Sequence, residues 1–289
     1  MRYYEPVFRP PSEASSLILQ VTVGCSHNRC VFCAMYRNKE FSVRDIDELK
    51  VEIAEAARIL PGCARVFLGD GDALAAPTDF LLEVLDALRA AFPGLRRISL
   101  YASPMNLLEK TPAELLALRE AGLKLFYLGV ESGSDRVLKV MAKGVTAEET
   151  AEAVLRGRRA GIKASVMILL GLGGVEGSRE HALETAKVLN AIQPEYASAL
   201  TWFPVERAPL HRLMESGRFN LPDDMGILNE LELLIENLEL EDTVFKANHA
   251  SNPLPVGGRL SRDSDRLLNL IRAAKSGEVP LRPVYLRGT

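Results

Sequence analysis

The sequence predicts an α/β fold built on a parallel sheet. Six apolar stretches of strand length alternate with amphipathic stretches of helix length over residues 17–203. Strands that are separated by helices favour a parallel sheet with right-handed crossovers. Glycines and polar residues follow the strands, and ligands bind α/β folds at the carboxyl ends of the strands. Periodicity alone leaves open whether this sheet is open or closes into a barrel.

The strands are expected at residues 17–23, 65–69, 97–101, 124–130, 163–170 and 196–203. The intervening helices are expected at residues 42–60, from residue 78 onward, and at 111–122, 146–161 and 178–191. We expect Ser42 and Thr78 to cap their helices. Thr111 and Thr146 each begin a capping box, because a glutamate follows three residues later.

Three regions are expected along the chain. Residues 1–16 form an extended, proline-containing leader, and residues 17–205 form the α/β domain. Residues 206–289 form a C-terminal extension of helices and loops, which packs on the domain and can cap its open end. Within the extension, helical segments are expected over residues 209–240 and a final helix over residues 261–274.

Composition and charge limit the classes of partner and the cellular location that we expect. The chain has 289 residues with a net charge of −3, so it lacks a broad basic field and we expect no nucleic-acid partner. No apolar run approaches the ~18 residues that cross a bilayer, and the N-terminus lacks the apolar core of a signal peptide. Clustered thiols of metal-binding type indicate a reducing compartment, so we expect a cytoplasmic location. The sequence gives no indication of the oligomeric state.

Three of the four cysteines lie within nine residues of each other, after the first strand. Four residues separate Cys25 from Cys30, and two separate Cys30 from Cys33. A zinc site needs a fourth ligand, but Cys63 stands alone and His27 lies inside the cysteine loop. A [4Fe–4S] cluster with three protein thiolates leaves one iron open for another ligand. We therefore favour an open cluster over zinc, a disulfide or a reactive thiol.

Two motifs resemble the radical S-adenosylmethionine (SAM) superfamily. The first is the cysteine loop with Phe32 before its last cysteine, although the superfamily usually has three residues, not four, between the first two cysteines. The second is Gly129-Val130-Glu131-Ser132-Gly133-Ser134-Asp135, followed by Lys143-Gly144. The resemblance covers about residues 15–205 and is nearest to the branch of the oxygen-independent coproporphyrinogen oxidases and the Elp3/MiaB-like proteins.

The resemblance implies a partial (β/α)6 barrel and an oxygen-sensitive enzyme. Cys25, Cys30 and Cys33 would bind three irons of a [4Fe–4S] cluster, and SAM would chelate the fourth. One electron would cleave SAM to methionine and a 5′-deoxyadenosyl radical, which would abstract hydrogen from the substrate. The expected partners are a small-molecule substrate and an electron donor such as flavodoxin or ferredoxin.

The resemblance also implies which residues contact SAM. Gly69, Asp70, Gly71 and Asp72 take the place of a Gly-Gly-Glu motif whose backbone meets the SAM amino group, and a plain tight turn is the alternative. Glu131 takes the place of a residue that contacts the SAM ribose, and a solvated acid at a strand end is the alternative.

Four further residues are weaker candidates for SAM binding. Lys143 aligns with a basic residue that pairs with the SAM carboxylate, or it is exposed to solvent. Ser103 ends the third strand, and Ile168 begins a loose adenine-contact pattern. Phe32 packs on the adenine or simply belongs to the core.

Outside the resemblance, the polar stretch 244–253 is expected at the open end of the domain. His249 is the candidate catalytic acid or base, because its ordinary pKa lies near neutrality, and Asn248 and Asn252 could contact substrate. The alternative is an ordinary loop with local hydrogen bonds. His181 is expected on a helix surface.

A non-catalytic protein is the alternative function. An iron–sulfur or zinc protein that transfers electrons or binds a partner would use the same cysteines. Metal analysis and a SAM cleavage assay separate the two classes.

Overall fold

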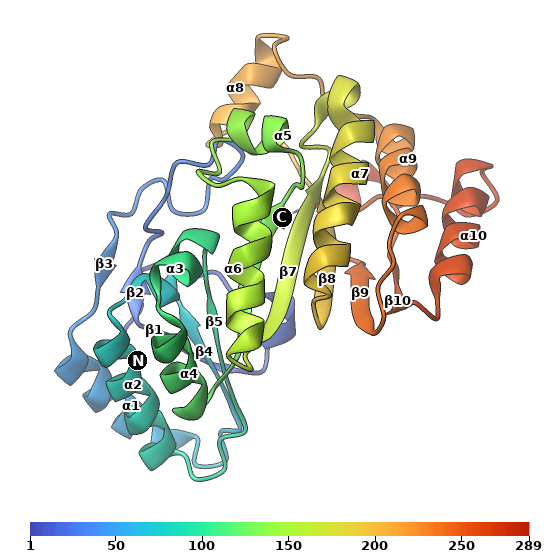
Figure 1. Cartoon of the computed structure of the whole chain (residues 1–289). Helices are drawn as coiled ribbons and strands as arrows, with labels where there is room; N and C mark the ends of the chain where they lie inside the picture. Colours follow the sequence, from blue (N-terminus) through green and yellow to red (C-terminus); the bar gives the residue numbers. More distant parts are fainter. Residues whose placement is uncertain (289) are drawn as a thin grey trace. The chain divides into compact units, whose positions relative to one another are not determined.

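The computed structural model describes residues 1–288, and the chain divides into two compact units (Figure 1). Both units contain strands and helices, as expected for an α/β protein. Unit 1 contains residues 1–28, 35–128 and 152–164, and unit 2 contains residues 29–34, 129–151 and those from 165 onward.

Unit 1 is built on a ladder of parallel strands. Strand β1 (Leu17–Gln20) pairs with β4 (Arg65–Gly69), and β4 pairs with β5 (Arg97–Tyr101). The first part of β6 (Leu123–Glu131) pairs with β5. All three pairings are parallel, so the carboxyl ends of these strands lie at one edge, as the sequence predicts.

A short antiparallel pair flanks the cysteine loop. Strand β2 (Thr22–Val23) pairs with β3 (Ser42–Val43). The expected first strand is therefore two strands, β1 and β2. The expectation that Ser42 caps a helix was wrong, because α1 (Ile46–Ile59) begins later and is capped by the side chain of Asp45.

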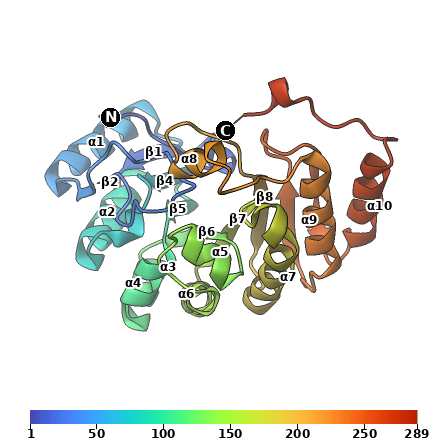
Figure 2. The same cartoon turned by 90° about the horizontal axis from the view of Figure 1, so that it is seen from above.

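The helices of unit 1 pack next to each other. Helix α2 (Thr78–Ala91) packs against α1 and against α4 (Pro112–Glu120), and Figure 2 shows α1 and α2 on one side of β4 and β5. The apolar face of α2 is buried, which explains the periodicity of its sequence. The sequence analysis did not predict two short helices, α3 (Pro104–Glu109) and the 3-10 helix η2 (Ala73–Ala75).

Both predicted capping boxes are confirmed. Thr111 and Glu114 exchange hydrogen bonds between side chain and main chain, and so do Thr146 and Glu149. Thr78, by contrast, does not cap α2: it is the first residue of the helix, and its hydroxyl donates to Glu114 at 2.6 Å.

Unit 2 contains a second ladder. Strand β7 (Lys163–Leu170) pairs in parallel with β8 (Tyr196–Thr201), and β8 pairs in parallel with β9 (Thr243–Ala247). Strand β10 (Val256–Leu260) pairs antiparallel with β9. The C-terminal extension therefore adds two strands to the helices and loops that the sequence predicts.

Helices cover the unit 2 strands. Helix α7 (Gly174–Ile192) packs on α9 (Asp224–Glu236), and α9 packs on α10 (Ser264–Lys275), as Figure 1 shows. The remaining helices are α5 (Asp135–Val140), α6 (Ala147–Arg159, which continues into unit 1), α8 (Pro209–Glu215) and the 3-10 helix η3 (Val284–Leu286). None of the helices in the described chain is long and apolar enough to span a membrane.

The N-terminal segment is anchored by a buried carboxylate. Glu13, in the 3-10 helix η1 (Pro11–Glu13), is fully buried. Its Oε1 atom accepts hydrogen bonds from Ser99 at 2.9 Å and from the Tyr127 hydroxyl at 2.6 Å, and it pairs with Arg97 at 2.9 Å. Burial, with Glu13 alongside, raises the pKa of Tyr127 above its ordinary value. Residues 1–16 thus reach the interior of unit 1.

Candidate functional site

The turn that follows β4 binds the unit 1 part of the cysteine loop. Asp70 Oδ2 accepts hydrogen bonds from the main-chain N–H of Gly24 and from Gln20 Nε2, each at 3.1 Å. Lys39 Nζ pairs with the same oxygen at 2.8 Å. Asp70 is fully buried, so these donors compensate a charge that would otherwise be costly to bury.

Asp72, two residues later, binds the same loop. Its Oδ2 atom accepts a hydrogen bond from the Ser26 hydroxyl. Burial raises the pKa of the Asp72 carboxyl, and the polar groups of Ser26, Asn106 and Ser103 nearby oppose this rise. Ser103 also caps α3 by accepting from the main-chain N–H of Asn106 at 3.3 Å. The predicted residues Asp72 and Ser103 are therefore neighbours.

Gly71 lies under an aromatic ring. A Cβ atom at this position would lie 2.3 Å from the Tyr36 ring, so glycine allows the close approach. Lys39 Nζ lies 5.7 Å from the centre of the same ring. Gly69 has no such neighbour within 4 Å. The second glycine of the motif thus fixes the segment that follows the last cysteine.

The unit 2 part of the cysteine loop is held by main-chain bonds. The N–H of Val31 donates to the carbonyl of Met141 at 3.0 Å, and the N–H of Leu210 donates to the carbonyl of Val31 at 2.9 Å. The indole of Trp202 donates to the carbonyl of Phe32 at 2.9 Å. The Phe32 side chain packs on an apolar cluster that includes Trp202 and Met141.

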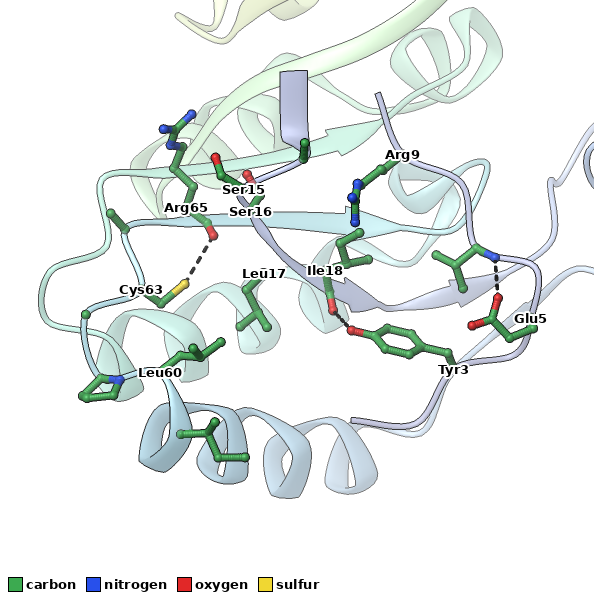
Figure 3. A pocket seen from close by; sticks show the side chains of 16 residues that line it. Tyr3, Glu5, Arg9, Ser15, Ser16, Leu17, Ile18, Leu60, Cys63 and Arg65 are labelled. Atoms are coloured by element: carbon green, nitrogen blue, oxygen red, sulfur yellow. Dashed lines mark hydrogen bonds between the residues drawn. The ribbon is translucent and has the colours of Figure 1, made fainter. Parts of the chain in front are cut away.

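The fourth cysteine lies apart from the turn after β4. Cys63 lines a pocket of ≈ 870 Å³ at the amino ends of β1 and β4, and its thiol donates to the carbonyl of Arg65 at 3.3 Å (Figure 3). No predicted site residue lines this pocket. Within residues 1–288, no cysteine forms a disulfide, and no three His, Cys, Asp or Glu side chains are grouped at metal-binding distance.

The end of β6 carries a second group of predicted residues. Glu131 has left-handed backbone geometry, with φ 64°. Its carboxylate pairs with Lys143 at 3.1 Å, and each residue is only 8% exposed. A Cβ atom on Gly129 would lie 1.7 Å from the Glu131 carboxylate, so this glycine makes room for the side chain. The structure therefore brings Glu131 and Lys143 together.

The next residues of the motif attach β6 to α7. Ser132 Oγ lies 2.7 Å from His181 Nδ1, and His181 Nε2 lies 3.5 Å from the Glu230 carboxylate. His181 is 1% exposed, so the expectation that it lies on a helix surface was wrong. A Cβ atom on Gly133 would lie 2.1 Å from the carbonyl oxygen of Glu184. Gly133 therefore allows close packing of β6 on α7.

The end of β7 is a packed, glycine-rich turn. Ile168 is 1% exposed, so its side chain belongs to the core. Gly171 has φ 88°, and its N–H donates to the Glu230 carboxylate at 2.7 Å.

The loop after β9 is ordered by its own side chains. His249 Nδ1 accepts from the main-chain N–H of Ser251 at 3.2 Å, and the Arg282 guanidinium donates to the His249 carbonyl at 2.7 Å. Burial lowers the pKa of His249, and the charge of Arg282 adds to this effect. Asn252 accepts from the N–H of Thr201 at 2.7 Å, so it supports β8, whereas Asn248 is exposed.

Sequence analysis missed four residues of this region: Gln20, Ser26, Tyr36 and Lys39. Each contacts the turn after β4, which lies 31 to 50 residues further along the chain. No local pattern reports a contact of this kind.

The sequence and the fold are similar to those of known proteins. Residues 19–186 match the family model "Radical SAM superfamily". A 5-amino-6-(D-ribitylamino)uracil–L-tyrosine 4-hydroxyphenyl transferase of Methanosarcina acetivorans is 28% identical over 210 residues, which are 66% of this chain and 53% of that protein. A tRNA-2-methylthio-N(6)-dimethylallyladenosine synthase of Dehalococcoides mccartyi is 29% identical over 84% of this chain and 56% of that protein. The chain thus spans about half the length of these curated relatives.

Solved structures show the same fold. Coproporphyrinogen III oxidase from Escherichia coli superposes with a TM-score of 0.58 at 18% identity, covering 76% of this chain and 51% of that one. Methylornithine synthase superposes with a TM-score of 0.53 at 21% identity, covering 78% of this chain and 63% of that one. The fold is therefore the partial-barrel α/β fold of these enzymes. On the match over residues 19–186, the chain belongs to the radical SAM superfamily, whose cofactors are a [4Fe–4S] cluster and SAM.

Proposed function

We propose that the chain is a radical SAM enzyme whose [4Fe–4S] cluster is bound by Cys25, Cys30 and Cys33. The observation that carries the proposal is the cysteine loop, which follows the first strands and is fixed on both sides by hydrogen bonds to other elements. When bound, the cluster supplies one electron that cleaves SAM to methionine and a 5′-deoxyadenosyl radical, and this radical removes a hydrogen atom from the substrate.

The residues near the turn after β4 fit these cofactors. Three thiolates complete three iron sites of a cubane cluster and leave the fourth open for SAM. The Oδ1 atoms of Asp70 and Asp72 are buried and have no hydrogen-bond partner within the described residues. These two acceptor atoms favour a hydrogen-bond donor such as the SAM ammonium nearby. We propose that the main chain of residues 69–72, together with Ser103 beside it, contacts the SAM ammonium.

The pair at the end of β6 fits other parts of SAM. The Glu131 carboxylate can accept hydrogen bonds from two ribose hydroxyls, and the Lys143 ammonium can pair with the SAM carboxylate. Their mutual ion pair compensates both charges at 8% exposure. We assign Phe32 and the main chain of Ile168 to the adenine, and His249 to acid–base chemistry on the substrate.

We propose a small molecule as the substrate class. The names of the relatives mention both small-molecule and nucleic-acid substrates. The name of the Methanosarcina enzyme mentions two small molecules, and that of the Dehalococcoides enzyme mentions a tRNA nucleoside. A net charge of −3 favours the small molecule, because nucleic-acid binding draws on clustered positive charge. The electron donor would be a protein such as flavodoxin or ferredoxin. A cluster-binding loop also suits the reducing cytoplasm.

The test is an anaerobic SAM cleavage assay. The protein is reconstituted with iron and sulfide, reduced and mixed with SAM, and 5′-deoxyadenosine is measured by mass spectrometry. We expect the product from the parent chain and from Cys63→Ala, because Cys63 donates to Arg65 at the opposite end of β4. We expect no product from Cys33→Ala, whose iron content should also fall.

Two results would contradict the proposal. Full iron and sulfide content in Cys33→Ala would overturn the ligand assignment. A parent cluster that forms and reduces, but neither binds nor cleaves SAM, would favour an iron–sulfur protein for electron transfer or partner binding.

A further inference from the structure

We propose that Asp70 and Asp72 are positioning residues that hold Cys25 for the cluster. The inference rests on the proposed function, because it takes Cys25 as a cluster ligand. Asp70 accepts from the N–H of Gly24 at 3.1 Å, and Asp72 accepts from the hydroxyl of Ser26. Gly24 and Ser26 are the residues on either side of Cys25. Two carboxylates from one turn therefore bind the main chain before this cysteine and the side chain after it.

The brace, defined as Asp70 and Asp72 with their bonds to Gly24 and Ser26, is more than a tight turn. A turn needs no ionised side chain, and burying a carboxylate is costly unless it is compensated. Both acids are 0% exposed. Asp70 has Lys39 as its cation, whereas Asp72 has no ion-pair partner within the described residues. The bonds to Gly24 and Ser26 in the cysteine loop offset part of this energetic cost.

Neighbouring elements hold the turn that carries the brace. The main-chain N–H of Asp70 donates to Thr22 in β2 at 3.2 Å, and the Tyr36 ring covers Gly71 between the two acids. The turn therefore cannot shift without moving these neighbours. Residues that orient a metal ligand in this way commonly set its affinity and the properties of the bound metal.

The brace acts on Cys25 selectively. Cys30 and Cys33 belong to the segment of residues 29–34, whose main chain is bonded to Met141 and Leu210 instead. Loosening the brace should therefore change the behaviour of Cys25 and leave the other cysteines as they are. A general structural defect would affect all four.

The test measures thiol alkylation in the full-length, cluster-free protein under reducing conditions. Trypsin places Cys25 and Cys63 on peptides of their own, because Arg29 lies between Cys25 and Cys30 and Arg58 precedes Cys63. Cys30 and Cys33 share the peptide of residues 30–37, and fragmentation of that peptide distinguishes them. Iodoacetamide incorporation at each peptide is followed with time by mass spectrometry. The variants are Ser26→Ala, which removes one bond, and Asp72→Asn, which removes the charge. Asp86→Asn, on the exposed face of α2, is the control.

We expect the alkylation rate of Cys25 to rise about fivefold in Ser26→Ala. Loss of one hydrogen bond of about 1 kcal/mol produces a factor of this size. The other three rates should stay within about twofold, the scatter usual for distant sites. In the loaded protein, the same variants should change the electron paramagnetic resonance spectrum or the midpoint potential of the reduced cluster. Unchanged Cys25 rates in both variants, or equal increases at all four cysteines, would overturn the proposal.

The two proposals fail in different ways. If the parent chain makes no 5′-deoxyadenosine, the proposed function fails, while the alkylation result still reports on the brace. If SAM is cleaved but Cys25 reacts no faster in either variant, only the brace is refuted.

Discussion

The turns after β4 and β6 have similar sequences but are stabilised differently. Both place glycines beside acidic or hydroxyl side chains at the end of a strand. In the β4 turn, Asp70 has three donors and Lys39 is only one of them. At the end of β6, Lys143 donates to the Glu131 carboxylate, and no other donor to it is found among the described residues.

The difference shows how one motif composition can serve two tasks. A carboxylate with several protein donors, such as Asp70, is committed to holding the chain. A carboxylate with a single lysine, both at 8% exposure, can exchange that partner for a ligand at little cost in other bonds. The number of protein donors, more than the residue type, separates Asp70 from Glu131.

The largest expected effect comes from removing the two lysines. Lys39→Met should lower the free energy of unfolding by about 4 kcal/mol, because it leaves the fully buried Asp70 without a cation. Lys143→Met should cost about 2 kcal/mol, because the Glu131 side chain is 11% exposed and partly solvated. Urea unfolding at neutral pH measures both.

Lys50→Met is the matched control for the two lysines. Its pair with Glu83 has side chains exposed by 42% and 48%, so Lys50→Met should leave the free energy of unfolding close to that of the parent chain. A larger loss for Lys143→Met than for Lys39→Met would reverse the comparison of the two turns.

Substitution of the glycines should give the next largest effect. Gly133→Ala brings a Cβ atom to 2.1 Å from a main-chain oxygen of α7, which cannot move alone, so we expect a loss of about 3 kcal/mol. Gly71→Ala meets a side-chain ring at 2.3 Å, which can shift, so we expect about 1–2 kcal/mol. Gly62→Ala meets nothing within 4 Å and is the control. Equal melting temperatures for all three variants would show that neither turn is closely packed.

The smallest expected effect is a change in the pH dependence of stability caused by His249. This residue lies in the loop after β9, whose polar groups bind each other. The pKa of His249 is lowered below its ordinary 6.5, so below that pH the unfolded chain binds more protons than the folded one. The free energy of unfolding should therefore rise with pH up to about 6.5 and fall on acidification. His249→Gln should flatten this slope between about pH 5 and 7, whereas Asn248→Ala should keep it. A slope that is equal in His249→Gln and the parent chain would contradict the assignment.

Local signals predicted much of the fold. The capping boxes at Thr111 and Thr146 are confirmed, because each depends on residues three apart. The pair β2 and β3 was missed, since two-residue strands have no periodicity. Strand β10 was missed because it contains Gly257 and Gly258, which are poor strand formers, and pairing with β9 decides its structure.

The candidate site was predictable in part. The motifs identified Glu131 and Lys143, and the structure brings them together. The donors to Asp70 and Asp72 were not identified, because those contacts join segments that are distant in sequence. His181 was assigned to a surface from its polarity, whereas Ser132 and Glu230 compensate it inside unit 2.

The buried carboxylate of Glu13 has a consequence for where this protein can be shortened. A chain beginning at Leu17 would keep every strand of unit 1, yet Arg97, Ser99 and Tyr127 would lose the group that accepts from all of them. Such a truncation amounts to an interior mutation, because it leaves buried donors unsatisfied. The first sixteen residues therefore belong to the cooperative folding unit. An affinity tag should be added before these residues and should not replace them.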